Sequence, residues 1–230
     1  SLEVALRAIS WMWAFHFFRN SSALSPTLFK KAIKFLYLHG RHIEKYLSKY
    51  YSPNTHLTGE ALGLYYLGTQ LPFLERSGHW RSLGEDILMA EIGRQVLPDG
   101  VYFEQSTWYQ RYTVDIFTHF LVLRALYGGP VYNGKAAALE QRLQKAFDFM
   151  MHLTQPGGRT PIIGDDDGGR MLPLTMEEPD DFRGTLAVGA VLFERGDLKF
   201  ASGAPSQEVF WLTGRKGLAT FDALRLEEPS

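Results

Sequence analysis

The chain has 230 residues, of which 45% are hydrophobic and 21% charged, with a formal net charge of -1 at pH 7. These values are typical of a folded globular protein and exclude a disordered chain or a strongly basic nucleic-acid-binding domain. The absence of cysteine excludes disulfides and thiolate metal sites. A polyanionic ligand stays compatible with this charge, because local arginines can make one cleft positive on a neutral protein.

The first predicted helix covers residues 2–18 and carries an apolar stripe at helical spacing. It is too short, and with Glu3, Arg7 and His16 too polar, to span a membrane. We therefore expect no membrane span. The stripe consists of Leu2, Ala5, Ile9 and Trp13.

A second helix begins at Ser25-Pro26, where a capping residue precedes proline at the first helical position. We expect its buried face to contain Leu28, Ala32, Phe35, His39 and Ile43, with His39 at the edge of the core.

Four further helices follow in the next hundred residues. One begins near Asn54 and runs to about Thr69, and the next ends before the turn 98–100. Residues 101–105 alternate like a strand, but we expect only a short extended segment. The fifth helix ends at Gly128-Gly129-Pro130 and the sixth at the turn 155–158. Their apolar positions are Trp80, Leu83, Ile87 and Ala90, then Ile116, Phe120, Leu123 and Tyr127, then Leu139, Leu143, Ala146, Phe147 and Met150.

The C-terminal part begins with a long loop, followed by weaker helices near 182–194 and 205–213. Helix starts near residues 2, 57 and 106 predict helix hairpins that repeat about every 50 residues. We predict an all-α array of helix hairpins in a single domain, residues 1–230, forming either an open solenoid or part of an α/α toroid.

The segment SPNTHLTGEALGLYYLG, residues 52–68, is the first candidate site. Asn54 is the expected N-cap, which places His56 and Glu60 in the first turns at i and i+4. The simpler interpretation is a capped helix with a surface His–Glu pair. Gly59 and Gly63 disfavour a helix, so they indicate close approach of another element or of a ligand.

The segment PDGVYFEQSTWYQRY, residues 98–112, is the second candidate site. Ser106 is its natural helix cap, and Tyr109 lies one turn later. The simpler interpretation of Tyr109 is a core aromatic with its hydroxyl at the rim. The polar residues that the segment brings together also include Glu104, Gln105, Gln110 and Arg111.

The segment IIGDDDGGR, residues 162–170, is the third candidate. Its aspartates, Asp165, Asp166 and Asp167, repel one another unless they are solvated or near cations such as Arg159 and Arg170. The spacing of an EF-hand is absent, so we predict no metal site. The chain also lacks a Walker loop, a GxSxG elbow and an HExxH motif, and we predict no cofactor.

Taken in this order and spacing, the three segments resemble the heparinase II/III-like polysaccharide lyases, including related alginate lyases. The resemblance extends from WMWAF near the start to FWLTGRKGL near the end. It implies an α/α toroid that a β-sandwich domain follows, and this chain corresponds to the toroid alone. Since the chain has no initiator Met and stops at RLEEPS, we expect it to be a fragment. The β-sandwich domain is then a missing partner, and bacterial periplasmic or secreted localisation is implied.

The resemblance also implies β-elimination on an acidic, uronate-containing polysaccharide. Tyr109 matches the catalytic tyrosine, His56 the base or carboxylate partner, and Asn54 the group that neutralises the uronate carboxylate. Arg111 is a candidate for lowering the pKa of Tyr109. This chain departs from the family at Thr55, where a second Asn is common, and at Gln110, where His is common.

The other polar residues are expected to support these groups. Glu60 and Glu104 would hold them or bind sugar hydroxyls, and the aspartates with Arg170 would form a polar floor. One rival hypothesis is a glycoside hydrolase with paired carboxylates such as Glu104 and Asp166. Another is a helical repeat that binds a glycan or a partner without catalysis.

Overall fold

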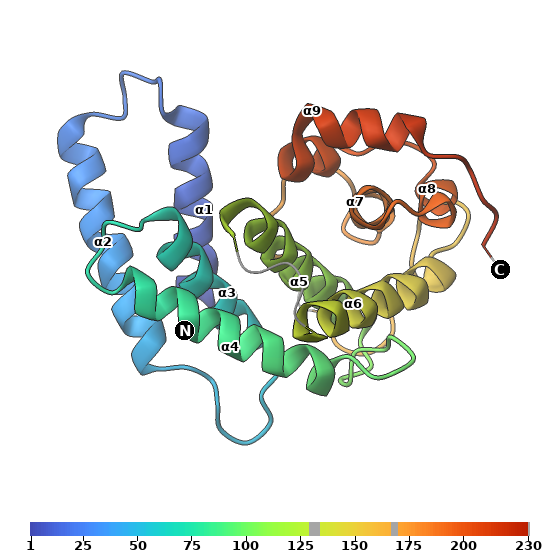
Figure 1. Ribbon diagram of the computed structural model, residues 1–230, viewed down its shortest axis with the longest axis horizontal. Coiled ribbons are helices and arrows are strands. Elements are labelled where there is room, and N and C mark those ends of the chain that lie inside the picture. The colour runs from blue at the N-terminus through green and yellow to red at the C-terminus, as the bar shows by residue number, and fades with distance from the viewer. Residues whose placement is uncertain (129–133, 167–169, 230) are drawn as a thin grey trace. The chain divides into compact units, whose positions relative to one another are not determined.

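The computed structural model describes residues 1–128, 134–166 and 170–229 (Figure 1). Within these residues the chain forms helices α1 to α9 and no β-strand, which confirms the all-α prediction. The chain divides into two compact units, residues 1–90 and 91–230. No helix in the described ranges combines the length and apolarity needed to cross a membrane.

The helices of the first unit pack α1 on α2 and both on α3. The bounds are α1 Leu2–Phe18, α2 Pro26–Lys45, α3 Thr55–Gln70 and α4 Ser77–Gln95, and the boundary between the units falls within α4. α3 is buried along almost its whole length. Gly63 allows this packing, because a Cβ there would lie 2.7 Å from the Cβ of Ala5 in α1. The expected close approach at Gly63 is therefore confirmed, and another helix makes it.

The buried face of α2 differs from the prediction. Leu28 and Phe35 are 49% and 41% exposed, whereas Leu36 and Gly40 are buried. The reason is Trp80, whose ring packs so closely on Gly40 that a Cβ there would lie 2.5 Å from it. A periodicity argument counts apolar side chains and misses a contact made by a glycine.

A charged cluster anchors α4 to α2 in the first unit. Glu44 accepts hydrogen bonds from Arg76 Nε at 2.9 Å and from Trp80 Nε1 at 3.0 Å, and His79 Nε2 lies 3.2 Å away. Burial alone would raise the pKa of Glu44, but the hydrogen bonds from Arg76 and Trp80 hold it below its usual value. The indole of buried Trp80 thereby has the polar partner that it requires.

The second unit is built around the hairpin of α5 and α6, on which α7 and α9 pack (Figure 1). Its helices are α5 Thr107–Tyr127, α6 Gly134–Leu153, α7 Arg183–Phe193, α8 Gly196–Ser202 and α9 Gln207–Ala223. The starts of α1, α3 and α5 at 2, 55 and 107 confirm the repeat of about 50 residues. The predicted core face of α6 is likewise buried.

Three details of this unit depart from the sequence prediction. α8 was not predicted, and α9 continues beyond residue 213 through a kink at Gly214, where φ is 68°. Tyr127 is 45% exposed rather than buried. α5 ends at a left-handed Gly128 as expected, while the next two residues of the predicted breaker, 129–130, lie outside the described residues.

Candidate active site

The start of α3 places Asn54 and His56 in the first unit. Asn54 Oδ1 accepts a hydrogen bond from the backbone N–H of His56 at 3.0 Å, which confirms the predicted cap. This bond turns the carbonyl side of the amide toward the helix. Thr55 is buried, whereas the His56 side chain is exposed.

Glu60 does not form the predicted pair with His56. Its fully buried carboxylate accepts hydrogen bonds from Ser48 N at 2.7 Å, Ser48 Oγ at 2.8 Å and Ser1 Oγ at 2.8 Å. Among the described residues, no hydrogen bond or ion pair joins Glu60 to the His56 ring. Spacing at i and i+4 gave the wrong partner, because Glu60 points into the packed side of α3. A buried carboxylate with these partners does not bind sugar hydroxyls.

The start of α5 meets the loop that carries Asp165 and Asp166, called here the aspartate loop (residues 162–166), in the second unit. Ser106 Oγ accepts from the backbone N–H of Tyr109 at 3.2 Å, as predicted for a cap, and also donates to the backbone carbonyl of Asp165 at 2.7 Å. Two further bonds join Thr107 to Ile163, one at 3.0 Å from Thr107 N to the Ile163 carbonyl and one at 3.2 Å from Ile163 N to Thr107 Oγ1. The structure therefore brings the second and third candidate segments together.

Gly164 makes this close approach possible. Its φ is +75°, and a Cβ at this position would lie 3.0 Å from the Cα of Ser106. The exposed side chains of Asp165 and Asp166 follow immediately, beside the start of α5. Asp167 lies outside the described residues. In the described residues no group of three or more His, Asp or Glu side chains is arranged to hold a metal ion.

The residues around Tyr109 have different environments. Tyr109 is half-buried, and Glu104 and Gln105 are exposed. Glu104 accepts a hydrogen bond from the hydroxyl of Tyr102 at 2.9 Å. Gln105 has a φ of +56°, which marks the sharp turn before the helix. Residues 101–105 form no strand and contribute a single bridge between Val96 and Tyr102, as expected.

Gln110 is a packing residue, contrary to the supporting role expected from its place beside Tyr109. It is 1% exposed, and its Oε1 accepts from Tyr102 N at 2.7 Å. Its Nε2 donates to the carbonyls of Gly100 and Ala146 at 3.0 and 3.2 Å. These three hydrogen bonds point into the fold. Through them the Gln110 amide connects the turn before α5 to α6.

Arg111 is also directed into the interior and is fully buried. Its Nη1 donates to the carbonyls of Pro179 at 3.0 Å and Asp181 at 3.2 Å, and its guanidinium lies 5.2 Å from the ring centre of Phe182. These contacts give Arg111 a structural role. Arg111 fastens the segment that precedes α7 onto α5.

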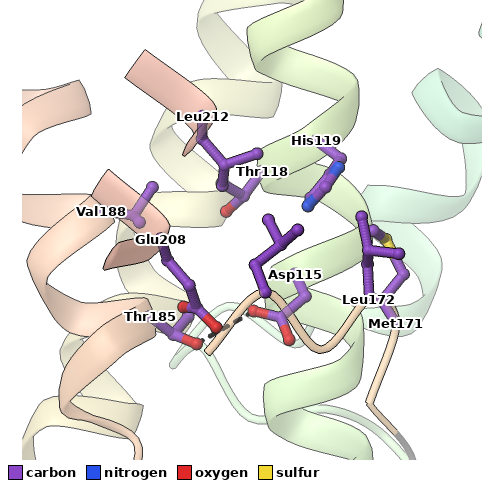
Figure 2. Close-up of a pocket in the computed structure, with 10 residues that line it drawn as sticks. Asp115, Thr118, His119, Met171, Leu172, Thr185, Val188, Glu208 and Leu212 are labelled. Carbon is purple, nitrogen blue, oxygen red and sulfur yellow. Dashed lines mark hydrogen bonds between the residues drawn. The ribbon is translucent and has the colours of Figure 1, made fainter. Parts of the chain in front are cut away.

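A buried charged cluster surrounds this arginine, and Figure 2 shows two of its members, Asp115 and Glu208. Arg111 Nε lies 3.8 Å from Asp115, and Arg111 Nη2 lies 3.7 Å from Glu208 of α9. Asp115 accepts a hydrogen bond from Thr185 of α7 at 3.0 Å, which Figure 2 shows as a dashed line. Arg170, predicted to form the polar floor, lies 3.6 Å from Glu208 and donates to the carbonyl of Glu177 at 3.2 Å.

Burial governs the ionisation of this cluster. It raises the pKa of Asp115 against the opposing effects of Arg111 and Thr185. Burial, together with the charge of Asp115, raises the pKa of Glu208 to about 7. Asp115 and Glu208 line a small pocket together with His119 (Figure 2). Burial lowers the pKa of His119 to about 3. The pocket has room for about one water molecule, so it is too small to hold a sugar.

This cluster was not predicted from the sequence, although a signal was present. Arg111, Asp115 and His119 follow one another at i, i+4 and i+8, which makes a charged and polar stripe along a mostly buried helix. Such a stripe inside a buried helix indicates partners on neighbouring elements. Those partners, Glu208 and Thr185, are distant in sequence.

The family model described as Heparinase II/III N-terminus matches residues 1–172 of this chain. The chain belongs to the heparinase II/III family. It is 32% identical over 164 residues to a heparin-sulfate lyase of Bacteroides stercoris and 30% identical over 174 residues to one of Pedobacter heparinus. Each alignment covers 71% of this chain and 24% of the relative, so the chain spans about a quarter of the length of the curated relatives it matches.

Solved structures with the same fold include a heparinase III, with a TM-score of 0.67 at 20% identity, which covers 87% of this chain and 30% of that one. A heparan sulfate lyase HepC from Pedobacter heparinus has a TM-score of 0.63 at 21% identity, with 88% of this chain and 30% of that chain covered. At such identities the likeness shows the fold, which is that of the heparinase toroid domains.

Proposed function

We propose that this chain is the helical part of a polysaccharide lyase that cleaves a uronate-containing polysaccharide by β-elimination. The observation that carries the proposal is its sequence identity of 32% and 30% to two heparin-sulfate lyases. Their names favour a sulfated, acidic glycan as the substrate class. An alginate-like polyuronate is the second candidate, because the same reaction requires only a uronic acid.

The reaction removes the proton at C5 of the uronate, forms the C4–C5 double bond and releases the glycosidic oxygen at C4 with a proton. Neutralising the C5 carboxylate allows negative charge to develop on it in the transition state. Asn54 is the proposed donor to this carboxylate. Its cap bond holds Oδ1 toward His56 N at 3.0 Å, so its amide nitrogen is directed away from the helix.

Tyr109 and His56 are the proposed groups for proton transfer. Tyr109 is fixed one turn into α5 by the Ser106 cap, and the phenol can act as base toward C5 or as acid toward the leaving oxygen. His56 is exposed at the first turn of α3, and an imidazole suits either a proton transfer or a bond to the carboxylate. Asp165 and Asp166 are proposed to shape the polar surface beside the start of α5.

Two rival functions predict different products. A glycoside hydrolase would use Glu104 and Asp166 and would release reducing ends without a new double bond. A glycan-binding repeat would release nothing. A screen of heparan sulfate, heparin and alginate, followed by the ultraviolet absorbance of the conjugated uronate, separates the three. Reducing ends that form without this absorbance would refute the lyase.

A further inference from the structure

A groove on the second unit has no role in the proposed reaction. It lies among the turn at Pro98, the side of α6 and Arg195, and none of the candidate catalytic residues lines it. Its volume of about 610 Å³ falls within the range of ligand pockets, roughly 300–1,000 Å³. The polar side chains that line it are Gln141, Arg142, Gln144, Lys145, Asp148 and Arg195.

Arg142 is the distinctive residue of this groove. It forms no hydrogen bond or ion pair with any residue in the described ranges, and its Nη1 is shielded from solvent. A shielded guanidinium N–H without an acceptor is unfavourable, so such groups are normally paired. The half-buried side chain of Arg142 lines the groove, so an anionic ligand in the groove would meet a guanidinium that no described residue pairs.

The other charged side chains that line the groove are paired, whereas Arg142 has no carboxylate partner among the described residues. Asp148 is bound by Lys145 at 3.1 Å and also by Arg195, whose guanidinium additionally binds Asp197. Asp148 is the carboxylate that lines the groove, together with three cationic side chains. It pairs with Lys145 and Arg195 but not with Arg142. The groove carries an excess of positive charge that no described residue neutralises at Arg142.

We propose that this groove is a secondary binding site for an acidic saccharide, in which Arg142 binds a carboxylate or sulfate group. The planar guanidinium presents paired donors that match the oxygens of either anion. Lys145, one turn along α6, adds charge, and the amides of Gln141 and Gln144 suit sugar hydroxyls. That the anion belongs to a saccharide rests on the proposed function, and the site itself rests on the groove and its charge.

The test compares Arg142→Gln with Arg215→Gln, an exposed position on α9 that does not line the groove and undergoes the same loss of charge. Because Arg142 forms no hydrogen bond or ion pair with any residue in the described ranges, both variants should keep the wild-type melting temperature. Calorimetry with a sulfated heparan octasaccharide should show affinity about tenfold weaker for Arg142→Gln, since one charge-assisted contact contributes roughly that factor. Arg215→Gln should change it less than twofold.

Nuclear magnetic resonance locates the contact. The Nε–Hε signal of Arg142 should shift on titration with the octasaccharide. If Arg142 binds sulfate groups, inorganic sulfate should reproduce part of this shift. If it binds carboxylates, an unsulfated polyuronate should reproduce it instead. Equal affinities of Arg142→Gln and wild type, or no shift at Arg142 with any of these probes, would overturn the proposal. Failure of the proposed function has a different signature, namely no unsaturated product from any polymer.

Discussion

Ser106 and Asp165 are joined by a hydrogen bond of 2.7 Å from the Ser106 hydroxyl to the Asp165 backbone carbonyl. The same hydroxyl oxygen accepts from the backbone N–H of Tyr109 at 3.2 Å. One small side chain therefore caps α5 and ties the aspartate loop to the turn that carries Tyr109. The two candidate segments of the second unit form a single substructure through it.

Ser106→Ala is expected to destabilise the chain by about 2 kcal/mol, because it removes a helix cap of about 1 kcal/mol and a part-buried hydrogen bond of similar size. The matched control is Ser25→Ala, which removes an exposed cap on α2 without a tertiary bond and should cost about 1 kcal/mol or less. Urea denaturation measures both. Equal losses would show that the bond to Asp165 contributes no stability.

The Ser106 cap was predictable from sequence and its second bond was not. Capping chemistry is local, so Ser25, Asn54 and Ser106 could all be identified from the residues that follow them. The bond to Asp165 joins positions 59 residues apart. Only the fold decides which loop reaches the cap, although Gly164 was visible as a residue permissive of a left-handed turn.

Glu208→Gln should change how stability depends on pH. With a pKa of about 7 in the folded chain against 4.5 ordinarily, Glu208 holds its proton better when folded. Its ionisation therefore lowers the unfolding free energy as pH rises from about 4.5 to 7. His119 has the opposite effect on stability, because burial lowers its pKa from 6.5 to about 3. As pH falls from about 6.5 to about 3, His119 takes up a proton in the unfolded chain but not in the folded one, so the unfolding free energy falls.

In the wild type these two slopes offset one another between about pH 4.5 and 6.5. Removing the Glu208 carboxyl leaves the His119 slope, so stability relative to wild type should rise by about 2–3 kcal/mol from pH 4.5 to 7. Chemical denaturation across this range provides the measurement, with the exposed Glu178→Gln as the control. Parallel curves for Glu208→Gln and wild type would show that Glu208 ionises normally in the fold.

Gly63→Ala should destabilise the first unit by about 1–2 kcal/mol. The new Cβ would lie 2.7 Å from the Cβ and 3.0 Å from the Cα of Ala5, and such overpacking outweighs the better helix propensity of alanine. Gly93→Ala on α4 is the contrasting variant, because a Cβ there meets nothing within 4 Å. It should stabilise by up to about 1 kcal/mol, and thermal melting of the two variants should move in opposite directions. A gain of stability in Gly63→Ala would contradict the close packing of α1 and α3.

The interior partners of polar residues were the part that sequence could not supply. Helix order, caps and the α6 core follow from local spacing and were predicted. Glu60 and Arg111 were assigned to the site because they lie near candidate residues along the chain, yet their charges are bound inside each unit by Ser48 and by the Pro179 and Asp181 carbonyls. Proximity along a helix does not specify which face a charge occupies.

Conversion of Tyr109 to Phe tests the central claim most directly. The variant keeps the ring and removes only the hydroxyl, so the fold and glycan affinity should persist while proton transfer is lost. Tyr127→Phe, in the last turn of the same helix and 45% exposed, is the matched control. Each is assayed on heparan sulfate by the ultraviolet absorbance of the unsaturated uronate, in this chain and in any longer polypeptide that carries it. We expect a fall of at least about a hundredfold in initial rate for Tyr109→Phe alone, as removal of a general acid or base produces. Unsaturated product formed at the wild-type rate by Tyr109→Phe would contradict it.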